Sequence, residues 1–447
     1  MEQIGKHFKM KNLLLAILLY PLTCTSQSKI RIKPGTAYPP AVAANTFDTI
    51  EVFNQTFDAE LTGKFASAKN TTTDYTISGG KLTFPVANGS YYQYSKQIVY
   101  DQATLSENCI QKATIICNSV DYGYGVGIGW RSINTQGFQW SVYGFHNFNI
   151  YSGNKGKVGV VTPSFGDFYS PTSETVPSVY DTIDYTFTRR GINYIMAIYN
   201  RNKNLNLSYE FVTYPSGSPF VAHQVAVPAL NWMGGGFSVL NWSYYLVKPR
   251  NPQFIILGNS ITYGQAASTQ AQRYADLIVN KNYNIVSGGG GDVTQDVVNR
   301  LAEIKLLQPK YALIMIGGND VYFNYSAATW QNNLKKIRDS LVSYGIIPIH
   351  LYPTCRTIAD MRPLRNFLDT CSNFATDKKI DLFAATLKSG TLYSLATEYD
   401  SGDGVHPSNA GHAKMASDAN AKLIEWGYDK IAGTELKRIK IIIKKGQ

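Results

Sequence analysis

Between residues 254 and 426 the chain alternates short apolar runs with segments of helical periodicity, and no other feature limits its fold as strongly. The apolar runs are Phe254–Leu257, Tyr283–Val286, Tyr311–Ile316, Ile346–Leu351 and Ile380–Phe383. The helical segments are Ala271–Asn280, Val293–Leu307, Ser326–Tyr344, Arg362–Thr376 and Asn409–Trp426. Strands that alternate with helices pair in parallel through right-handed crossovers. The pattern predicts a three-layer α/β domain whose loops meet at the carboxyl edge of its sheet.

The first half of the chain has a different pattern. Residues 46–248 contain short alternating runs bounded by turn residues such as Gly79-Gly80 and Gly191, with almost no helical periodicity. Many short strands at this spacing predict an all-β sandwich. The pattern changes at Lys248-Pro249-Arg250-Asn251-Pro252, where two prolines favour an extended connector. We expect a β-sandwich domain at 27–248, an α/β domain at 252–428 and a basic tail at 429–447.

Composition and charge exclude several classes of protein. Charged residues make up 16% of the chain and aromatic residues 13%, which excludes intrinsic disorder, coiled coil and collagen. Of the net charge of +11, the first 26 residues carry +2 and the last dozen +5, so about +4 remains for the rest. The folded domains therefore lack the basic character that a nucleic-acid partner requires.

The N-terminus has the pattern of a secretory signal. Lys11 precedes the apolar run Leu13–Leu22, and small residues follow up to Ser26. This run is too short to span a bilayer, so we expect residues 1–26 to direct export to the periplasm, the cell surface or the medium. An alternative is a lipid anchor at Cys24, although the preceding residues fit a lipobox poorly. No other segment has the length and apolar character of a transmembrane helix.

Four cysteines follow the predicted signal, and none has metal-ligand spacing: Cys109, Cys117, Cys355 and Cys371. Export permits disulfides, while domains of this size do not require them. Pairing and free buried thiols both remain open at this stage.

Residues capable of chemistry follow the predicted strands of the α/β domain. Ser260 lies in a glycine-flanked turn after the first strand, and the run Gly288–Gly291 follows the second. Asn319 follows the third strand, and Asp403 stands three residues before His406 in the last loop. A serine can act as a nucleophile, glycine N–H groups and an amide can stabilise an oxyanion, and a carboxylate can orient a histidine base. Each residue alone is more often a helix cap, a turn or a surface residue, but their common position at strand ends favours a catalytic site.

These motifs resemble the SGNH hydrolase family, also called GDSL esterases, over residues 252 to about 428. The resemblance rests on Gly-Asn-Ser-Ile-Thr, Gly-Gly-Asp-x-Thr, Gly-Gly-Asn-Asp and Asp-x-x-His-Pro. It implies a flavodoxin-like fold, a catalytic triad and an oxyanion hole without metal or cofactor. By position, the triad is Ser260, His406 and Asp403, and the oxyanion donors are Ser260, Gly291 and Asn319. The family usually has Asp before the serine, and here Asn259 keeps an acceptor oxygen at that position.

The N-terminal half loosely resembles the concanavalin and laminin-G sandwiches that accompany carbohydrate-active enzymes. A hydrolase joined to such a sandwich resembles bacterial acetyl xylan esterases, which implies an acylated carbohydrate or another small-acyl ester as substrate. A lipase, a thioesterase or an acyltransferase of the same fold is an alternative. A non-catalytic carbohydrate-binding or adhesion protein is another, in which sandwich aromatics stack on sugars, although most such side chains belong to a core: Trp130, Trp140, Tyr143 and Phe145.

Overall fold

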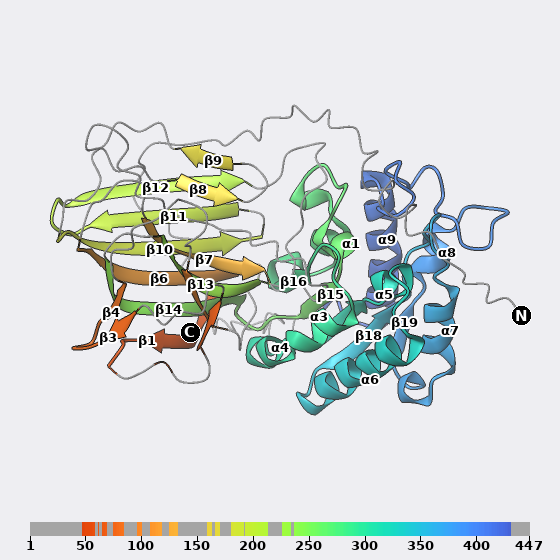
Figure 1. Ribbon diagram of the computed structural model, residues 1–447. Coiled ribbons are helices and arrows are strands. Elements are labelled where there is room, and N and C mark those ends of the chain that lie inside the picture. The colour runs from red at the N-terminus through yellow and green to blue at the C-terminus, as the bar shows by residue number, and fades with distance from the viewer. Residues whose placement is uncertain are drawn as a thin grey trace, which may run out of the picture.

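A computed structural model of the 447-residue chain describes residues 47–58, 61, 65–68, 75–84, 96–100, 108–118, 125–132, 159–162, 166–169, 180–191, 193–212, 226–233 and 237–430. A β-rich region and an α/β domain lie side by side (Figure 1). The predicted signal with Cys24, the aromatic residues Trp140, Tyr143 and Phe145, and most of the predicted tail lie outside the described residues.

The β-rich region contains antiparallel sheets. The largest, with eight strands, comprises β1 (Phe47–Gln55), β3 (Thr76–Ile77), β4 (Leu82–Phe84), β6 (Asn108–Cys117), β10 (Thr182–Arg190), β11 (Asn193–Asn200), β12 (Leu205–Val212) and β14 (Phe237–Pro249). A second sheet comprises β2 (Phe65–Ala68), β5 (Lys96–Tyr100), β7 (Gly125–Ser132) and β13 (Ala226–Met233), and β8 (Gly159–Thr162) pairs with β9 (Gly166–Tyr169). Strand β7 of the second sheet contacts β6 and β10 of the first.

The core of the large sheet forms around Trp242, which is fully buried on β14. Its ring meets the ring of Phe53 edge-on, with centroids 4.7 Å apart. Its indole Nε1 donates to Gln111 Oε1 at 3.4 Å. Trp242 and Tyr244, at alternate positions of β14, are thus both buried on one face of the sheet.

The α/β domain has a five-stranded parallel sheet in the order β16-β15-β17-β18-β19. The strands are β15 (Phe254–Gly258), β16 (Asn284–Gly288), β17 (Tyr311–Met315), β18 (Ile347–Leu351) and β19 (Lys378–Ile380). The helices are α1 (Ser260–Tyr263), α2 (Tyr274–Leu277), α3 (Thr294–Asn299), α4 (Leu301–Leu307), α5 (Gly318–Tyr322), α6 (Ala327–Ser343), α7 (Arg362–Thr370), α8 (Leu382–Thr386) and α9 (Asn409–Glu425).

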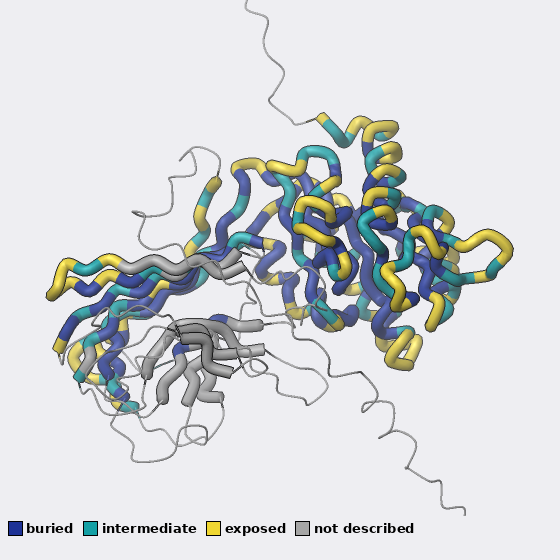
Figure 2. Tube along the Cα trace, turned by 90° about the horizontal axis from the view of Figure 1, so that it is seen from above, coloured by how far each residue is buried: buried dark blue, intermediate teal, exposed yellow. Residues whose placement is uncertain are grey.

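Helices cover both faces of this sheet, so the predicted α/β architecture is confirmed. Ile255 and Leu257 of β15 pack with the side chains of α3, α4, α6 and α7. Phe254 and Ile256 point the other way and pack with α2 and α9. Because successive residues of a strand face opposite sides, a strand covered on both sides is apolar throughout, and β15 is buried along its whole length. Figure 2 shows buried segments, in dark blue, through the middle of the α/β domain.

Several predicted elements are wrong in detail. The helix expected at Val293–Leu307 is interrupted at Arg300 and forms α3 and α4, and the helix expected at Arg362–Thr376 ends at Thr370. The helix expected at Ala271–Asn280 is broken into a 3-10 turn at Gln270–Gln272 and the short α2, because Arg273 between them has extended backbone. The strand expected to continue to Phe383 stops at Ile380, since the Asp381 side chain accepts from Ala384 N at 2.8 Å and begins α8. Short polar side chains at helix N-termini override apolar runs in this way.

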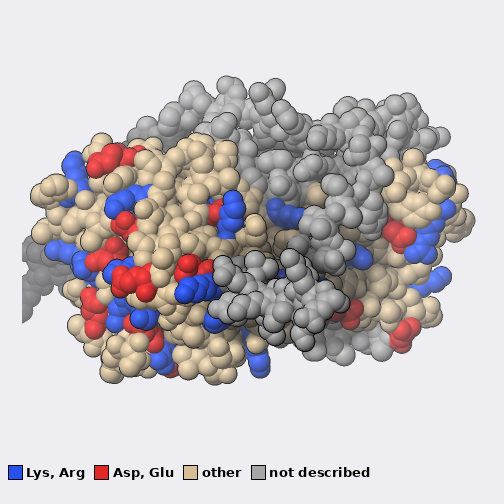
Figure 3. Space-filling model, turned by 180° about the vertical axis from the view of Figure 1, so that it is seen from behind, with Lys and Arg blue, Asp and Glu red and all other residues tan. Residues whose placement is uncertain are grey.

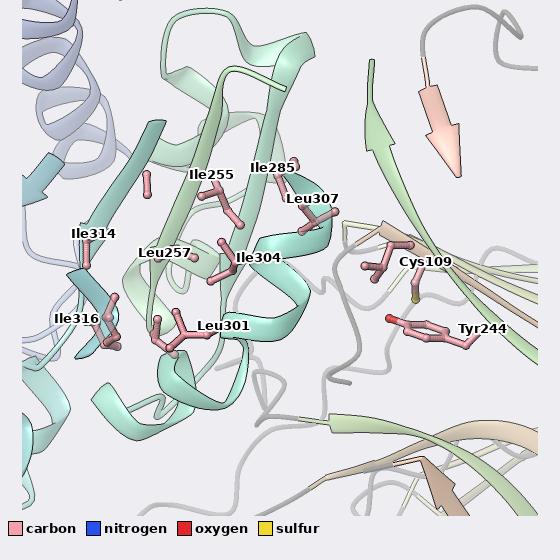
Figure 4. Packing of buried hydrophobic residues seen from close by; sticks show 14 of the residues in the cluster. Cys109, Tyr244, Ile255, Leu257, Ile285, Leu301, Ile304, Leu307, Ile314 and Ile316 are labelled. Atoms are coloured by element: carbon pink, nitrogen blue, oxygen red, sulfur yellow. The ribbon is translucent and has the colours of Figure 1, made fainter. Parts of the chain in front are cut away.

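The two parts of the chain share one cluster of buried apolar side chains. It runs from Trp242 and Tyr244 of β14 to Ile285 of β16 and Leu307 of α4. Figure 4 shows Ile285 and Leu307 facing Cys109 of the β-rich region. Lys248 Nζ also donates to the carbonyl oxygen of Leu307 at 3.1 Å. The β-rich region is therefore packed against the α/β domain.

Three cysteine thiols, those of Cys109, Cys355 and Cys371, are free. Cys109 and Cys355 are buried, and Cys371 is partly buried. Burial raises the pKa of Cys109 and of Cys355 to about 12, so both are neutral, apolar fillers of the core.

His412 of α9 forms hydrogen bonds with two segments that follow β15. It is fully buried, its Nδ1 accepts from Tyr274 N at 3.3 Å, and its Nε2 donates to Gln265 O at 3.3 Å. Tyr274 in turn bonds Thr262 of α1 through its hydroxyl at 2.7 Å. Burial lowers the pKa of His412 from 6.5 to about 4, so the folded protein holds this ring neutral.

The shared cluster predicts that substitutions of two adjacent leucines change the free energy of unfolding by very different amounts. Leu307 is fully buried, whereas Leu306 is 42% exposed. We expect Leu307→Ala to lower the free energy of unfolding by about 2–5 kcal/mol because it opens a cavity. Leu306→Ala is the matched control and should change it by less than about 0.5 kcal/mol. Denaturant unfolding of the full chain measures both, and equal small effects would contradict a tightly packed contact.

His412 predicts a loss of stability in acid. The unfolded ring binds a proton near pH 6.5 and the folded ring only near pH 4, so its stabilising contribution is complete above 6.5 and falls as the pH drops toward 4. The wild type should lose about 2 kcal/mol from this source between pH 7 and pH 5. His412→Asn should be less stable at pH 7, and its deficit should narrow by that amount at pH 5. A deficit that does not change with pH would contradict the assignment.

Candidate active site

Three neighbouring strand ends bring the predicted site residues to one edge of the sheet. Gly258 at the end of β15 is in register with Gly288 of β16 and Met315 of β17. The segments that follow carry Ser260, Gly291 and Asn319. Since adjacent parallel strands end at the same edge, these segments converge there.

The turn that carries Ser260 is held by its neighbours in the chain. Asn259 has extended backbone, and its Oδ1 accepts from Ile261 N at 3.1 Å, which caps α1. The amide oxygen therefore supplies the acceptor that was expected at this position. Helix α1 lies so close to β16 that a Cβ on Gly288 would come within 2.7 Å of Tyr263 N. This close approach fixes Ser260 at the sheet edge.

Ser260, His406 and Asp403 form a continuous chain of hydrogen bonds. Ser260 Oγ lies 2.9 Å from His406 Nε2, and His406 Nδ1 lies 2.6 Å from Asp403 Oδ2. A carboxylate can only accept, so Nδ1 carries the hydrogen and Nε2 is left to accept from the serine hydroxyl. This tautomer is the one that a general base needs.

The Asp403 carboxylate is held in its charged form. Burial alone would raise its pKa, but hydrogen bonds from the His406 ring and from the backbone N–H groups of His406 and Val405 bring the pKa down to about 2. Both backbone groups donate to Oδ1 at 2.8 Å, which leaves Oδ2 for the imidazole. The loop itself thus fixes the direction of the carboxylate.

Three further hydrogen bonds anchor the His406 loop. Asp400 Oδ1 accepts from Gly402 N at 2.9 Å and Gly404 N at 3.0 Å. Thr357 N, from the segment after β18, donates to Gly404 O at 2.7 Å. The position of His406 is therefore fixed from both sides.

Two of the predicted oxyanion donors, Gly291 and Asn319, lie on segments that contact each other. Gly291 is exposed, with φ of +75°, where glycine carries no strain. Asn319 Nδ2 donates to the carbonyl oxygen of Asp292, the next residue, at 2.9 Å. The amide of Asn319 has a second hydrogen that this bond does not use. The arrangement can thus present an amide donor beside the glycine loop.

Buried carboxylates fasten the glycine loop to α5. Asp292 pairs with Arg300 of the α3–α4 junction at 2.6 Å. Asp320 of α5 accepts from Thr294 N at 2.9 Å and from Thr294 Oγ1 at 2.6 Å. Burial, with Asp292 adding to it, raises the pKa of Asp296 to about 7. Thr294 of the Gly-Gly-Asp-x-Thr motif and Asp320 of the Gly-Gly-Asn-Asp motif therefore link the segment after β16 to the segment after β17.

Sequence reasoning missed Arg356. Its Nη1 donates to Asn319 Oδ1 at 3.0 Å, and its side chain is 2% exposed. It follows β18 in Pro353-Thr354-Cys355-Arg356. A polar residue at the carboxyl end of a strand was the signal that identified Ser260 and Asn319, and it applies here too.

Within the part of the chain that the structure describes, no cluster of three His, Cys, Asp or Glu side chains is placed to hold a metal ion. None of the helices described there combines the length and apolar character of a membrane-spanning segment. On the described surface seen in Figure 3, basic and acidic side chains are intermixed.

Solved structures of esterases and of lectins are similar to parts of the chain. A GDSL-like lipase from Bacteroides thetaiotaomicron is 19% identical over 39% of this chain and 88% of its own, with a TM-score of 0.34. A mutant of an acetyl-xylooligosaccharide esterase from Geobacillus is 21% identical over 39% of this chain and 94% of its own, with a TM-score of 0.31. A seed lectin from Lotus tetragonolobus is 11% identical over 45% of this chain and 100% of its own, with a TM-score of 0.32.

Sequence comparison concerns the α/β domain alone. No curated protein sequence is significantly similar to the chain. The model of the GDSL-like lipase/acylhydrolase family matches residues 256–414, the segment that carries Ser260, Asn319 and His406. Residues 256–414 are therefore a domain of the GDSL-like lipase/acylhydrolase family.

Proposed function

We propose that the protein is an exported esterase that removes acetyl or similarly small acyl groups from a carbohydrate, with Ser260 as its nucleophile. The observation that carries the proposal is the hydrogen-bonded series of Ser260, His406 and Asp403. Nucleophile, base and orienting carboxylate are each within hydrogen-bond reach of the next, as acyl transfer requires.

The reaction follows from these roles. Ser260 Oγ attacks the ester carbonyl carbon while its proton passes to His406 Nε2. The tetrahedral intermediate then collapses, the bond to the alcohol oxygen breaks, and His406 returns the proton to that oxygen. Water attacks the acyl-serine with His406 again as base, so the acid leaves and Ser260 regains its proton. Asp403 stabilises the His406 imidazolium during both acylation and deacylation of Ser260.

The negative charge of the intermediate needs donors that are already in place. The backbone N–H groups of Ser260 and Gly291 and the Asn319 amide are the donors in this proposal. Each such donor is worth about a hundredfold to a thousandfold in turnover. Because Asn319 is 6% exposed, its contribution benefits from a low local dielectric constant.

Two features of the site edge support a short acyl group on a sugar. A small pocket lies beside Asn259 and Gly318, and its apolar walls include Ile261 and Ile316. Tyr322, the last residue of α5, and Phe323, its C-cap, follow Asn319 by three and four residues and are 44% and 42% exposed. Residues at this spacing lie on one side of a helix, and exposed aromatic rings suit the apolar face of a sugar ring.

The β-rich region fits the same proposal in a supporting role. We propose that its two larger sheets face each other as a sandwich of the concanavalin or laminin-G type. The contact of β7 with β6 and β10 supports this arrangement. Its packing against α4 and β16 gives it a structural role whether or not it binds sugar.

The nucleophile assignment predicts a near-complete loss of activity. Ser260→Ala should lower turnover of 4-nitrophenyl acetate, and acetate release from acetylated xylan, by at least about a thousandfold. The fold should persist, because the hydroxyl bonds only His406 among the hydrogen bonds of the described residues. Ser268→Ala, at an exposed serine of the next loop, is the control. A Ser260→Ala enzyme with a tenth of normal activity would contradict the assignment.

The exposed aromatic side chains predict that a substitution at Tyr322 affects a sugar substrate more than a substrate without a sugar. Tyr322→Ala should raise KM for an acetylated xylo-oligosaccharide about tenfold, because stacking on an aromatic ring is worth about 1 kcal/mol or more. KM and kcat for 4-nitrophenyl acetate should change little. Tyr180→Ala removes a tyrosine that is 73% exposed in the β-rich region and serves as control. Equal effects of Tyr322→Ala on both substrates would contradict a sugar contact.

A further inference from the structure

Arg356 is a buried cation without an ion-pair partner. Its side chain is 2% exposed, and no carboxylate of the described residues lies within 4.0 Å of it. Its Nε has no hydrogen-bond partner there either. Burying an unpaired charge is costly and adds nothing to stability. An arginine in such surroundings therefore calls for a role other than stability.

The guanidinium is directed at the Asn319 carboxamide. Nη1 donates to Asn319 Oδ1 at 3.0 Å and to the carbonyl oxygen of Gly318 at 3.3 Å. A Cβ on Gly318 would come within 2.7 Å of Nη2. The glycine immediately before Asn319 thus makes room for the arginine.

Arg356 and Asp292 together permit only one orientation of the carboxamide. On one side the Asp292 carbonyl oxygen accepts from Nδ2 at 2.9 Å, and on the other side Arg356 donates to Oδ1. If the amide were flipped, an oxygen would face an oxygen and an N–H group would face the guanidinium. Both contacts would be repulsive, so the amide hydrogens stay on the side of the glycine loop.

The same hydrogen bond polarises the amide. A donor on Oδ1 withdraws electron density from the carboxamide and makes Nδ2–H a stronger donor. Burial lowers the pKa of Arg356 to about 10, and the charge of Asp403 opposes this shift. The guanidinium is therefore still protonated at neutral pH and places a positive charge behind Asn319.

We infer that Arg356 is a positioning residue of the oxyanion hole, which fixes and polarises the Asn319 amide for the developing oxyanion. This inference rests on the proposed esterase function. The segment that carries it also reaches the base, because Thr357 N donates to Gly404 O at 2.7 Å in the His406 loop. One loop after β18 thus contacts both the oxyanion donor and the loop of the general base.

A double-mutant cycle on the full chain tests the inference, with 4-nitrophenyl acetate as substrate. Arg356→Met should lower kcat about tenfold to a hundredfold with KM within about twofold, since the oxyanion exists only in the transition state. Asn319→Ala should lower kcat about a hundredfold or more. The double variant should be within about threefold of Asn319→Ala, because Arg356 acts through Asn319.

Controls separate the inference from folding and from the proposed function. Arg362→Met removes an arginine of the same segment that pairs with Asp360 at the surface and should leave kcat unchanged. If Arg356→Met does not fold, Arg356→Lys takes its place in the cycle, and the same non-additivity is expected. If the kcat loss of the double variant equals the product of the two single losses while Ser260→Ala is inactive, the role of Arg356 is overturned and the proposed function stands. A fully active Ser260→Ala would instead overturn the proposed function.

Discussion

Parallel pairing of β16, β15 and β17 is the constraint on which the site depends. It places the carboxyl ends of three strands in register, so three loops that are far apart in sequence meet at one edge. The sheet can hold this register because its strands are apolar on both faces and covered by helices on both sides. Ser260 and the two predicted oxyanion loops are therefore positioned by the core rather than by contacts with a ligand.

A second layer of polar groups turns this proximity into defined geometry. Asn259 caps α1, Asp320 holds Thr294, and Arg300 neutralises Asp292. None of these groups reaches a substrate in the proposed reaction. They satisfy buried backbone and side-chain atoms that would otherwise destabilise the loops. Acidic residues in the motifs thus serve the structure as much as the chemistry.

The sequence was most informative where one physical pattern repeats. Strand–helix alternation predicted the α/β domain, and polar residues at strand ends predicted residues that the structure brings together in one hydrogen-bonded series, Ser260 with His406 and Asp403. Their catalytic roles, like those of Gly291 and Asn319, stay predictions. The domain limits and the export signal also stay predictions.

What the sequence did not predict depends on contacts between distant segments. Arg356 follows a strand end, as Ser260 and Asn319 do, but only the fold places it against Asn319, 37 residues away. His412 lies on a helix with an ordinary sequence, yet it accepts from Tyr274 138 residues before it. The break near Arg273 likewise follows from tertiary packing, since the buried arginine donates to Tyr263 O at 3.2 Å. Local propensity is a weak guide where such long-range bonds decide the backbone.

The junction between the two parts is short and well bonded. Strand β14 continues to Pro249, Gln253 N already donates to Tyr283 O at 2.8 Å, and β15 begins at Phe254. A flexible tether would let an attached domain search a volume set by the linker length. Here the β-rich region has no such freedom, so any polymer held on it would reach Ser260 in one direction and at one distance. The effective concentration of an acyl group at Ser260 would then depend on the spacing of acyl groups along such a polymer.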